Sequence, residues 1–588
     1  MLATACIPRC MPANKSVSRR FVAHLLLQRR LQNLFLDNGK YHYTRFQVLT
    51  ELLHRDMLQS SPASSLCHDI LHEIFSMNCP ADEEFSEDCI ADLLDDISLH
   101  TARYTSQVCS SWRTVMLSSP SIWAHILNLD HLSFANDNWT NEVLKRTKNC
   151  SLSIYVSLEP HWRSIDLFFS IINDCWNRLQ RVAFTLSVST RNDLHDPRWR
   201  LLNRHGPNIE IFVAFVNTSY HLRTQPLTPL SIGKLFGNNA PHLHTLSTTE
   251  MFIDICPPSS FAAMRYLKLE HCDIYPEALH ALAQMKSLEY FYVLSENVHD
   301  TMDAYPDIGA TIPQFELPNL KVMDITAKLS TLLAFLGHII PPQQCEFSFT
   351  VYQARNTLSH TELDQLRRSF ITYYQCFQQS NTVDILSIRA SPAYLYIANQ
   401  ISGNELTLCG EMMFDFAICK RSGVLGLDWD CITETIVQPL SSEDLSAAKT
   451  VELELDFPQS ILLSNIHLAT LLYSLAATET LLCKSCMIEL ITLIESRNDR
   501  RTIFPRLHTI ILCEDENKLS SIAIMRFIIQ RRKTATPIRC INLQTSKARN
   551  QEELLLLEGQ KDLQVVWGTK MQKLIDELWI CFRTFSYL

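Results

Sequence analysis

Apolar positions between residues 66 and 123 predict short amphipathic helices. Leu66, Ile70, Leu71, Ile74 and Phe75 recur at the spacing that places them on one stripe of a helix. A helix this short cannot bury an apolar stripe alone. We therefore expect it to pack against neighbouring helices or against a partner.

The same pattern predicts two further helices downstream. One carries four apolar residues at spacings of 4, 4 and 3: Tyr104, Val108, Trp112 and Val115. The other is expected to start at Ser119-Pro120, because a capping hydroxyl followed by a proline is a helix start signal. Three short helices are therefore predicted between residues 61 and 130.

From about residue 150 the period of the pattern changes. Residues 152–156 alternate between apolar and polar positions, residues 165–179 read as an amphipathic helix, and residues 182–186 alternate again. Such a strand–helix–strand rhythm predicts parallel strands, because parallel neighbours need a crossover connection.

A unit close to Pro-x-Leu-x-x-Leu-x-Leu recurs along this region. It is found at 241–246, 264–269 and 318–325, with similar strands at 383–388, 451–455, 505–512 and 537–543 and helices at 462–475 and 522–529. Recurring strand–helix units predict a solenoid, in which each unit buries its apolar face against the next. A doubly wound α/β domain is the alternative. Insertions near 295–315 and 390–450 are expected to be loops, although 414–416 has the alternation of a short strand.

The composition is that of ordinary globular material and narrows the function classes. Of the 588 residues, 46% are hydrophobic and 19% charged, and the net charge of −10 offers no general attraction to nucleic acid. The 20 cysteines have no regular spacing, which indicates reduced thiols in an intracellular protein. No uncharged apolar run reaches the ~18 residues of a membrane span. We expect no nucleic-acid or membrane partner.

Signatures of catalysis and of cofactor binding are missing from the sequence. Only 12 glycines occur, and the phosphate-binding and nucleophile-elbow motifs are absent. Cys483 and Cys486 form the only C-x-x-C pair, and both are predicted to be core residues. Four cations lie at the C-terminal end of the predicted helix 522–529: Arg526, Arg531, Arg532 and Lys533. We interpret this basic cluster as a solvated helix end. We expect no catalytic residues, no metal site and no cofactor.

The order of three motifs in the N-terminal third resembles an F-box. A hydrophobic helix at 66–75 is followed by Val108-Cys109-x-x-Trp112-Arg113 and then by Ser-x-Pro120-x-x-Trp123. F-box-like proteins abundant in mushroom-forming fungi have Leu-Pro-x-Glu-Ile-Leu, Val-Cys-x-x-Trp-Arg and Thr-Pro-x-Leu-Trp in this order. This chain departs from them by having Cys67 in place of the usual proline and by an insert with eight carboxylates and no Lys or Arg between Asp82 and Asp96.

The resemblance implies a substrate-recognition subunit of an SCF-type cullin–RING ubiquitin ligase. The F-box would dock to a Skp-type adaptor, and through it to a cullin, while the repeat region, similar to degenerate leucine-rich repeats, would bind an unknown protein target. Residues expected for adaptor docking or for the core of the module are Leu66, Ile70, Leu71, Ile74, Phe75, Val108, Cys109, Trp112 and Val115. Such a subunit is not itself an enzyme.

The expected organisation has three parts: a basic helical extension at 1–60, the F-box-like module at 61–130 with an acidic insert at 80–97, and an α/β repeat region at 140–588. An alternative is a non-catalytic scaffold whose N-terminal helices only cap the solenoid. The segment before Asp37 contains six Lys or Arg residues and no acid, as mitochondrial transit peptides do, which leaves a mitochondrial enzyme as a third hypothesis. The expected location is the cytoplasm, the nucleus or both.

Overall fold

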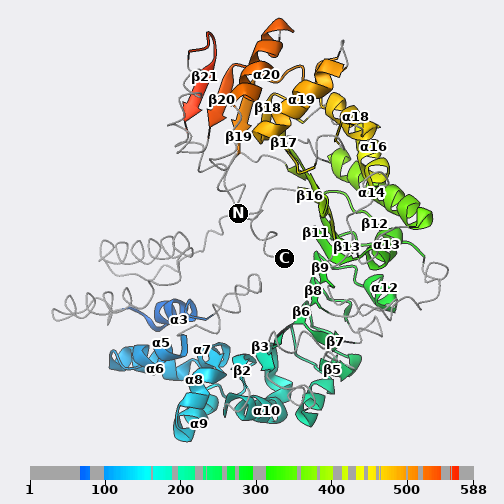
Figure 1. Cartoon of the computed structure of the whole chain (residues 1–588). Coiled ribbons are helices and arrows are strands. Elements are labelled where there is room, and N and C mark those ends of the chain that lie inside the picture. Colours follow the sequence, from blue (N-terminus) through cyan, green and yellow to red (C-terminus); the bar gives the residue numbers. More distant parts are fainter. Residues whose placement is uncertain are drawn as a thin grey trace, which may run out of the picture. The chain divides into compact units, whose positions relative to one another are not determined.

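The protein is a mixed α/β molecule with a large, mostly parallel sheet (Figure 1). A computed structural model describes residues 66–567, apart from 80–97 and shorter stretches, of which the longest are 219–229, 296–312, 401–412, 421–431 and 544–556. The expected basic extension at 1–60 and the acidic insert at 80–97 lie outside the described residues. The chain divides into two compact units, Met1–Ile154 and Tyr155–Leu588.

Short helices dominate the described part of the first unit. They are α3 (His68–Ser76), α5 (Ser98–Thr105), α6 (Ser110–Ser118), α7 (Pro120–His125), α8 (Leu129–Phe134) and α9 (Asp137–Arg146), with the two-residue strand β1 (Leu127–Asn128) and the start of β2 (Leu152–Leu158). Pro120 occupies the first turn of α7, as predicted, because a proline needs no backbone N–H there. The Ser119 hydroxyl does not cap α7. It donates instead to the Val115 carbonyl oxygen at 2.7 Å.

The segment 104–115, expected to be one helical stripe, contains two helices. α5 ends at Thr105 and α6 begins at Ser110, so Tyr104 and Val108 do not share a helix with Trp112. Tyr104 and Val108 are exposed, whereas Val115 is buried. The spacing was compatible with a continuous helix, but the short polar segment 105–107 ends α5 instead.

The second unit is built from strands that pair side by side in long succession. In the first half these are β3 (Leu179–Val188), β4 (Ile211–Thr218), β6 (Thr245–Thr249), β8 (Tyr266–Glu270), β9 (Tyr290–Leu294), β11 (Val322–Lys328) and β13 (Glu346–Gln353). In the second half they are β14 (Ile385–Ser391), β15 (Tyr394–Gln400), β16 (Met413–Lys420), β17 (Thr450–Leu455), β18 (Thr480–Cys483), β19 (Thr509–Leu512), β20 (Cys540–Leu543) and β21 (Gln564–Trp567). Two small parallel pairs accompany them, β5 (Leu230–Gly233) with β7 (Met251–Ile253) and β10 (Phe315–Glu316) with β12 (Ile339–Ile340).

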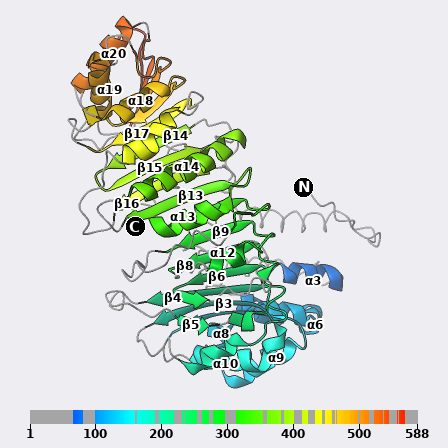
Figure 2. The ribbon, with the colours of Figure 1, turned by 90° about the vertical axis from the view of Figure 1, so that its right-hand side faces the viewer.

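The helices of this unit alternate with the strands along the chain. They are α10 (Arg163–Cys175), α12 (Glu277–Leu282), α13 (Leu329–His338), α14 (His360–Ser380), α16 (Gln438–Ser442), α18 (Ile466–Ser474), α19 (Ser485–Arg497) and α20 (Ser521–Lys533). Shorter helical turns occur at η2 (Trp176–Arg178), η3 (Pro197–Asn203), η4 (Leu235–Asn238) and η8 (Thr433–Val437). From α12 onward the helices line one face of the sheet (Figures 1 and 2).

Spatial order in the sheet follows chain order with one exception. Parallel pairing runs from β3 through β4, β6, β8, β9 and β11 to β13, and again from β14 through β17 to β21. Between these two runs, β16 pairs parallel with β13, and β15 pairs antiparallel with both β16 and β14. A three-stranded meander is therefore inserted into an otherwise parallel sheet.

The expectation of a loop at 390–450 is wrong for the described part of that range. β15, β16, η8 and α16 occupy it, and the alternation at 414–416 lies within β16. The strands were hard to recognise because β15 is antiparallel to its neighbours and is joined to β14 by a tight turn rather than by a crossover helix.

Aromatic side chains form the core between the sheet and its helices. Phe291 of β9 packs on Phe335 of α13, Phe347 of β13 on Tyr373 of α14, and Phe416 of β16 on Phe370 of α14, with ring centroids 5.1–5.5 Å apart. Since side chains alternate along a strand, residues 292, 348 and 415 point to the opposite face. We call this opposite face of strands β8 to β17 the helix-free face, because none of the described helices of this unit packs on it (Figures 1 and 2).

Candidate functional site

The first candidate site is the group of helices in the first unit. Leu71 and Phe75 are buried and lie four residues apart, so they form one face of α3. The Phe75 ring meets the Trp112 ring of α6 edge to face, with centroids 5.2 Å apart. Val115 and Met116 continue the buried side of α6. Sequence reasoning placed all of these positions except Met116 in the module.

A second apolar stripe of α3 adjoins the buried one. Ile70 and Ile74 are half-buried, and Met77, which follows the helix, is 61% exposed. Ile70 lies about 100° around the helix from Leu71, so the two stripes adjoin without coinciding. Half-buried Leu66 precedes the helix at the same spacing. α3 therefore uses one apolar stripe internally and leaves its neighbour accessible in the described part of the chain.

The remaining predicted residues lie at the turn that leads into α6. Val108 is 48% exposed, Cys109 is the half-buried N-cap residue of α6, and Trp112 is half-buried. The Trp112 indole N–H is shielded from water and has no hydrogen-bond partner among the described residues. Val108 and Cys109 thus do not belong to the core that Phe75, Trp112 and Val115 form.

α7 is held against the rest of the unit by Trp123, which is fully buried. Its indole N–H donates to the Met116 carbonyl oxygen at 2.8 Å, which ties α7 to the end of α6. The Arg146 guanidinium of α9 lies 4.6 Å from the centroid of the Trp123 ring and 5.3 Å from that of Trp139. The motif tryptophan at 123 is therefore a packing residue of the unit.

The residues that flank the insert are in direct contact. The Asn78 side-chain amide donates to the Ser98 carbonyl oxygen at 3.0 Å, and the Ser98 hydroxyl donates to the Asn78 carbonyl oxygen at 2.7 Å. The end of α3 is thereby joined directly to the start of α5. Sequence reasoning had no signal for this contact, because the two residues are 20 positions apart.

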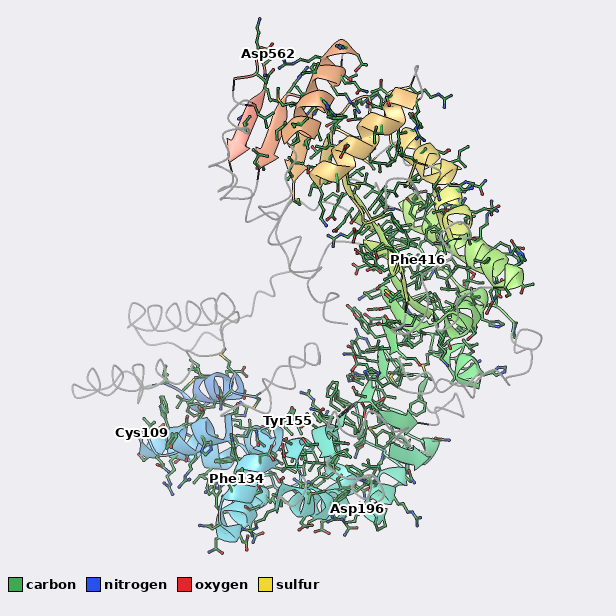
Figure 3. All side chains as sticks on the ribbon, in the orientation of Figure 1. Cys109, Phe134, Tyr155, Asp196, Phe416 and Asp562 are labelled. Atoms are coloured by element: carbon green, nitrogen blue, oxygen red, sulfur yellow. The ribbon has the colours of Figure 1, made fainter. Side chains whose placement is uncertain are left out.

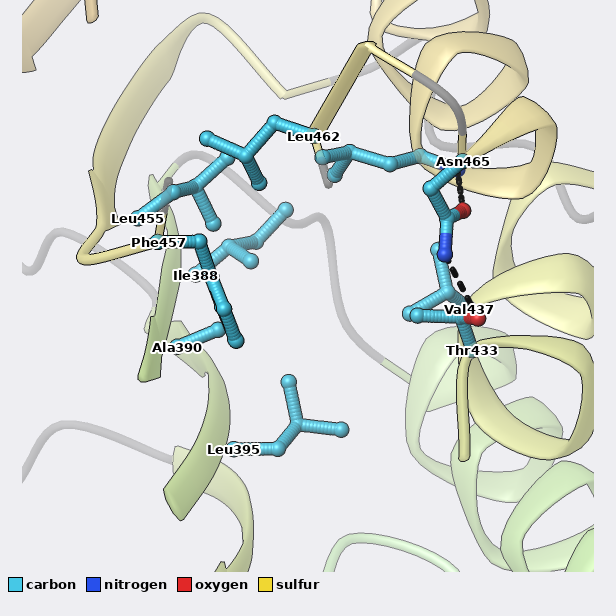
Figure 4. A pocket seen from close by; sticks show the side chains of 10 residues that line it. Ile388, Ala390, Leu395, Thr433, Val437, Leu455, Phe457, Leu462 and Asn465 are labelled. Carbon is cyan, nitrogen blue, oxygen red and sulfur yellow. Dashed lines mark hydrogen bonds between the residues drawn. The ribbon is translucent and has the colours of Figure 1, made fainter. Parts of the chain in front are cut away.

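A second candidate is a small cavity in the second unit, between the sheet and its helices (Figure 4). Its volume is about 30 Å³, enough for one or two waters, and its lining is almost entirely apolar. Its polar groups, Asn465 and Thr433, satisfy each other: the amide donates to the hydroxyl at 2.9 Å and accepts from the Leu468 N–H at 3.0 Å. The cavity is a packing defect of the core and does not suit a ligand.

The sequence predictions for the cysteine pair and for the basic cluster need correction. Cys483 is buried at the end of β18, but Cys486 is exposed because it lies in the first turn of α19. Arg531, predicted as solvated, is fully buried and pairs with Glu495 of α19 at 2.8 Å. It also donates to the carbonyl oxygens of Ile503 and Phe504. The burial of this arginine cannot be read from the sequence, because its partner Glu495 is 36 residues away.

The described residues also bear on metal binding and on membrane spanning. No group of three or more His, Cys, Asp or Glu side chains in this part of the chain is arranged to hold a metal ion. None of the described helices combines the length and the apolar character that a bilayer crossing requires. No model of a known protein family matches the chain, and no curated protein is significantly similar to it.

Proposed function

We propose that the chain is a substrate-recognition subunit of an SCF-type cullin–RING ubiquitin ligase. In this proposal the helices α3, α6 and α7 form an F-box-like module, the accessible stripe of α3 docks to a Skp-type adaptor, and the second unit binds a protein target. The chain holds the target while other subunits carry out the chemistry, so it is not itself an enzyme.

The observation that carries the proposal is that the two apolar stripes of α3 differ in burial. One stripe, Leu71 and Phe75, packs on α6. The adjoining stripe is half-buried at Ile70 and Ile74 and is followed by exposed Met77. A solvated helix has little reason to carry two apolar stripes unless a partner covers one of them. The motif order Val-Cys-x-x-Trp-Arg and Ser-x-Pro-x-x-Trp supports the choice of partner.

The pairing of strands supports the repeat-array part of the proposal. Successive strands from β3 to β13 and from β17 to β21 are parallel neighbours, and helices lie between most of them along the chain. This is the arrangement expected of a leucine-rich-repeat-like solenoid, interrupted by the meander β14–β16. Solenoids present an extended sheet surface that suits the recognition of another protein.

The proposal is tested by co-purification of the full chain with a recombinant Skp-type adaptor. We expect the wild-type chain to retain the adaptor and the Ile70→Asp/Ile74→Asp variant to lose it, because two buried carboxylates at the interface cost several kcal/mol. Phe134→Asp is the matched control. Phe134 (labelled in Figure 3) is a 74% exposed apolar residue of the same unit, at the end of α8. Failure of a folded wild-type chain to bind would favour the alternative, a scaffold whose helices only cap the array.

A further inference from the structure

One register row of the helix-free face carries charged and polar side chains across five adjacent strands. Lys268 of β8 pairs with Tyr292 of β9, which pairs in turn with Asp324 of β11, Ser348 of β13 and Asp415 of β16. We call Asp324, Ser348 and Asp415 the acidic row. These three residues come from three segments of the chain that are far apart in sequence, and the sheet brings them side by side.

The acidic row has fewer hydrogen-bond donors than acceptors. The Ser348 hydroxyl lowers the pKa of both carboxyl groups as a hydrogen-bonding neighbour, although a serine carries only one proton to donate, and the Phe349 backbone N–H also lowers the pKa of Asp415. Asp415 is only 2% exposed, and its Oδ2 atom has no hydrogen-bond partner among the described residues. A buried carboxylate oxygen without a donor costs about 1–3 kcal/mol or more.

The ion pairs of the helix-free face lie at its flanks, although the charge of Lys268 also lowers the pKa of Asp324. On one flank Lys268 pairs with Glu270 at 2.8 Å, and on the other Arg389 pairs with Glu452 at 2.6 Å. Asp324 and Asp415, by contrast, form no ion pair with any described residue, and neither does Glu346 at the start of β13. The face therefore has paired charges at its sides and unpaired acids at its centre.

The pKa values of the two carboxyl groups reflect this environment. Burial raises the pKa of Asp324 to about 6 and that of Asp415 to about 7, and the charge of Asp324 contributes to the second shift. A cation placed between them would offset both the burial and the mutual repulsion. Binding of a cation near neutral pH would therefore be coupled to the release of protons from the two carboxyl groups.

Aromatic rings flank the acidic row on the side of β8 and β9. The Tyr266 ring lies 5.5 Å from that of Tyr292 and 6.0 Å from that of Tyr290, and Tyr292 is the register neighbour of Asp324. A guanidinium group stacks on aromatic faces and donates up to five N–H groups in a planar fork, which a single ammonium cannot do. Neighbouring tyrosines and unpaired carboxylates together match arginine better than lysine.

We propose that the acidic row binds an arginine side chain of an extended protein segment. Half-buried Asp324 accepts its N–H groups, buried Asp415 contributes its charge, and the three tyrosines flank the guanidinium. The proposal specifies which class of protein the receptor would bind. It rests on the proposed ligase function only in that the bound protein is taken to be a substrate. The negative centre of the face excludes a nucleic-acid backbone as occupant.

The test is a selection from a random dodecapeptide display library on the immobilised full chain. We expect arginine to be enriched at one position of the selected peptides. The Asp324→Asn/Asp415→Asn variant should lose this enrichment. Glu454→Gln/Glu479→Gln, which removes the same charge from acids away from the acidic row, should keep it. Selection of no peptide, selection without arginine, or unchanged selection on the Asn variant would overturn the proposal.

A second measurement does not depend on folding of the variants. A selected peptide and its copy with citrulline in place of the arginine are titrated onto the wild-type chain by fluorescence anisotropy. We expect citrulline to weaken binding about tenfold or more, because it keeps the shape but lacks the charge. Equal affinities would contradict the proposal. Neither experiment contains the adaptor, so failure of adaptor docking leaves both readouts unaffected.

Discussion

Asn78 and Ser98 hold each other by two reciprocal hydrogen bonds, although 20 positions separate them along the chain. The Ser98 hydroxyl is buried, and it satisfies the Asn78 carbonyl at the end of α3. The residues on either side of the insert, which sets this sequence apart from the F-box pattern, are therefore in direct contact.

Shortening the insert is expected to leave the module folded. Replacing residues 82–95 by a short Gly-Ser linker preserves Asn78 and Ser98, and loop length contributes only weakly to stability. The hydrogen-exchange rates of the α3 and α6 amides in the shortened chain should match those in the full chain within about twofold. Ser98→Ala should instead destabilise the module by about 1 kcal/mol, since it removes one of the two bonds. A collapse of α3 protection in the shortened chain would contradict this account.

The Phe75–Trp112 contact is expected to determine the stability of α3. Phe75→Ala should cost about 3–5 kcal/mol, because it opens a cavity under α3, whereas Phe134→Ala at an exposed position should stay within about 0.5 kcal/mol of wild type. A double-mutant cycle with Trp112→Ala should give a coupling of about 0.5–1.5 kcal/mol. The measurement is hydrogen exchange of α3 amides. Additive single effects would show that the two rings stabilise the module independently.

The buried pair Arg531–Glu495 predicts an asymmetric response to mutation. Arg531→Met leaves the Glu495 carboxylate buried without its partner and should destabilise the second unit by about 3–5 kcal/mol. Adding Glu495→Leu should recover most of that loss, because the double variant buries no unpaired charge. Thermal unfolding followed by circular dichroism reports both values. A double variant as unstable as the single one would show that the remaining bonds of Arg531 to Ile503 and Phe504 dominate.

The acidic row predicts that stability falls as pH rises toward neutral. Both carboxyl pKa values, about 6 and about 7, lie above the ordinary value of an aspartate side chain, so the folded state binds more protons than the unfolded state between about pH 4 and pH 7. The contribution is fully present below pH 4 and is lost as pH passes through the folded pKa values. Other charged or titratable groups on the helix-free face around the row are Lys268, Glu270, Tyr292, Lys328, Glu346 and Tyr396.

Asp415→Asn isolates this effect. The amide mimics the protonated carboxyl, so the variant should match wild type near pH 4 and be about 2–4 kcal/mol more stable at pH 8. Glu454→Gln, at a partly exposed and paired position, should show little change at either pH. Denaturant unfolding at the two pH values checks the prediction. A variant that is less stable than wild type at pH 8 would mean that the Asp415 charge is already satisfied.

Sequence patterns anticipated the parts of this fold that depend on local chemistry. The apolar stripe of α3, the proline at the start of α7 and the strands at 182–186, 318–325 and 451–455 all follow from spacing and from backbone preference. The antiparallel meander, the buried state of Arg531 and the exposure of Cys486 depend on contacts between distant segments. The acidic row was missed for the same reason, because Asp324 and Asp415 become neighbours of Ser348 only through strand register.

In the proposed complex an adaptor covers the second stripe of α3. Hydrogen exchange of the full chain, with and without a saturating recombinant Skp-type adaptor, locates the contact directly. We expect slower exchange at residues 66–79, with the strands of the second unit unchanged. Unchanged exchange at residues 66–79, or protection confined to the second unit, would contradict the proposed docking.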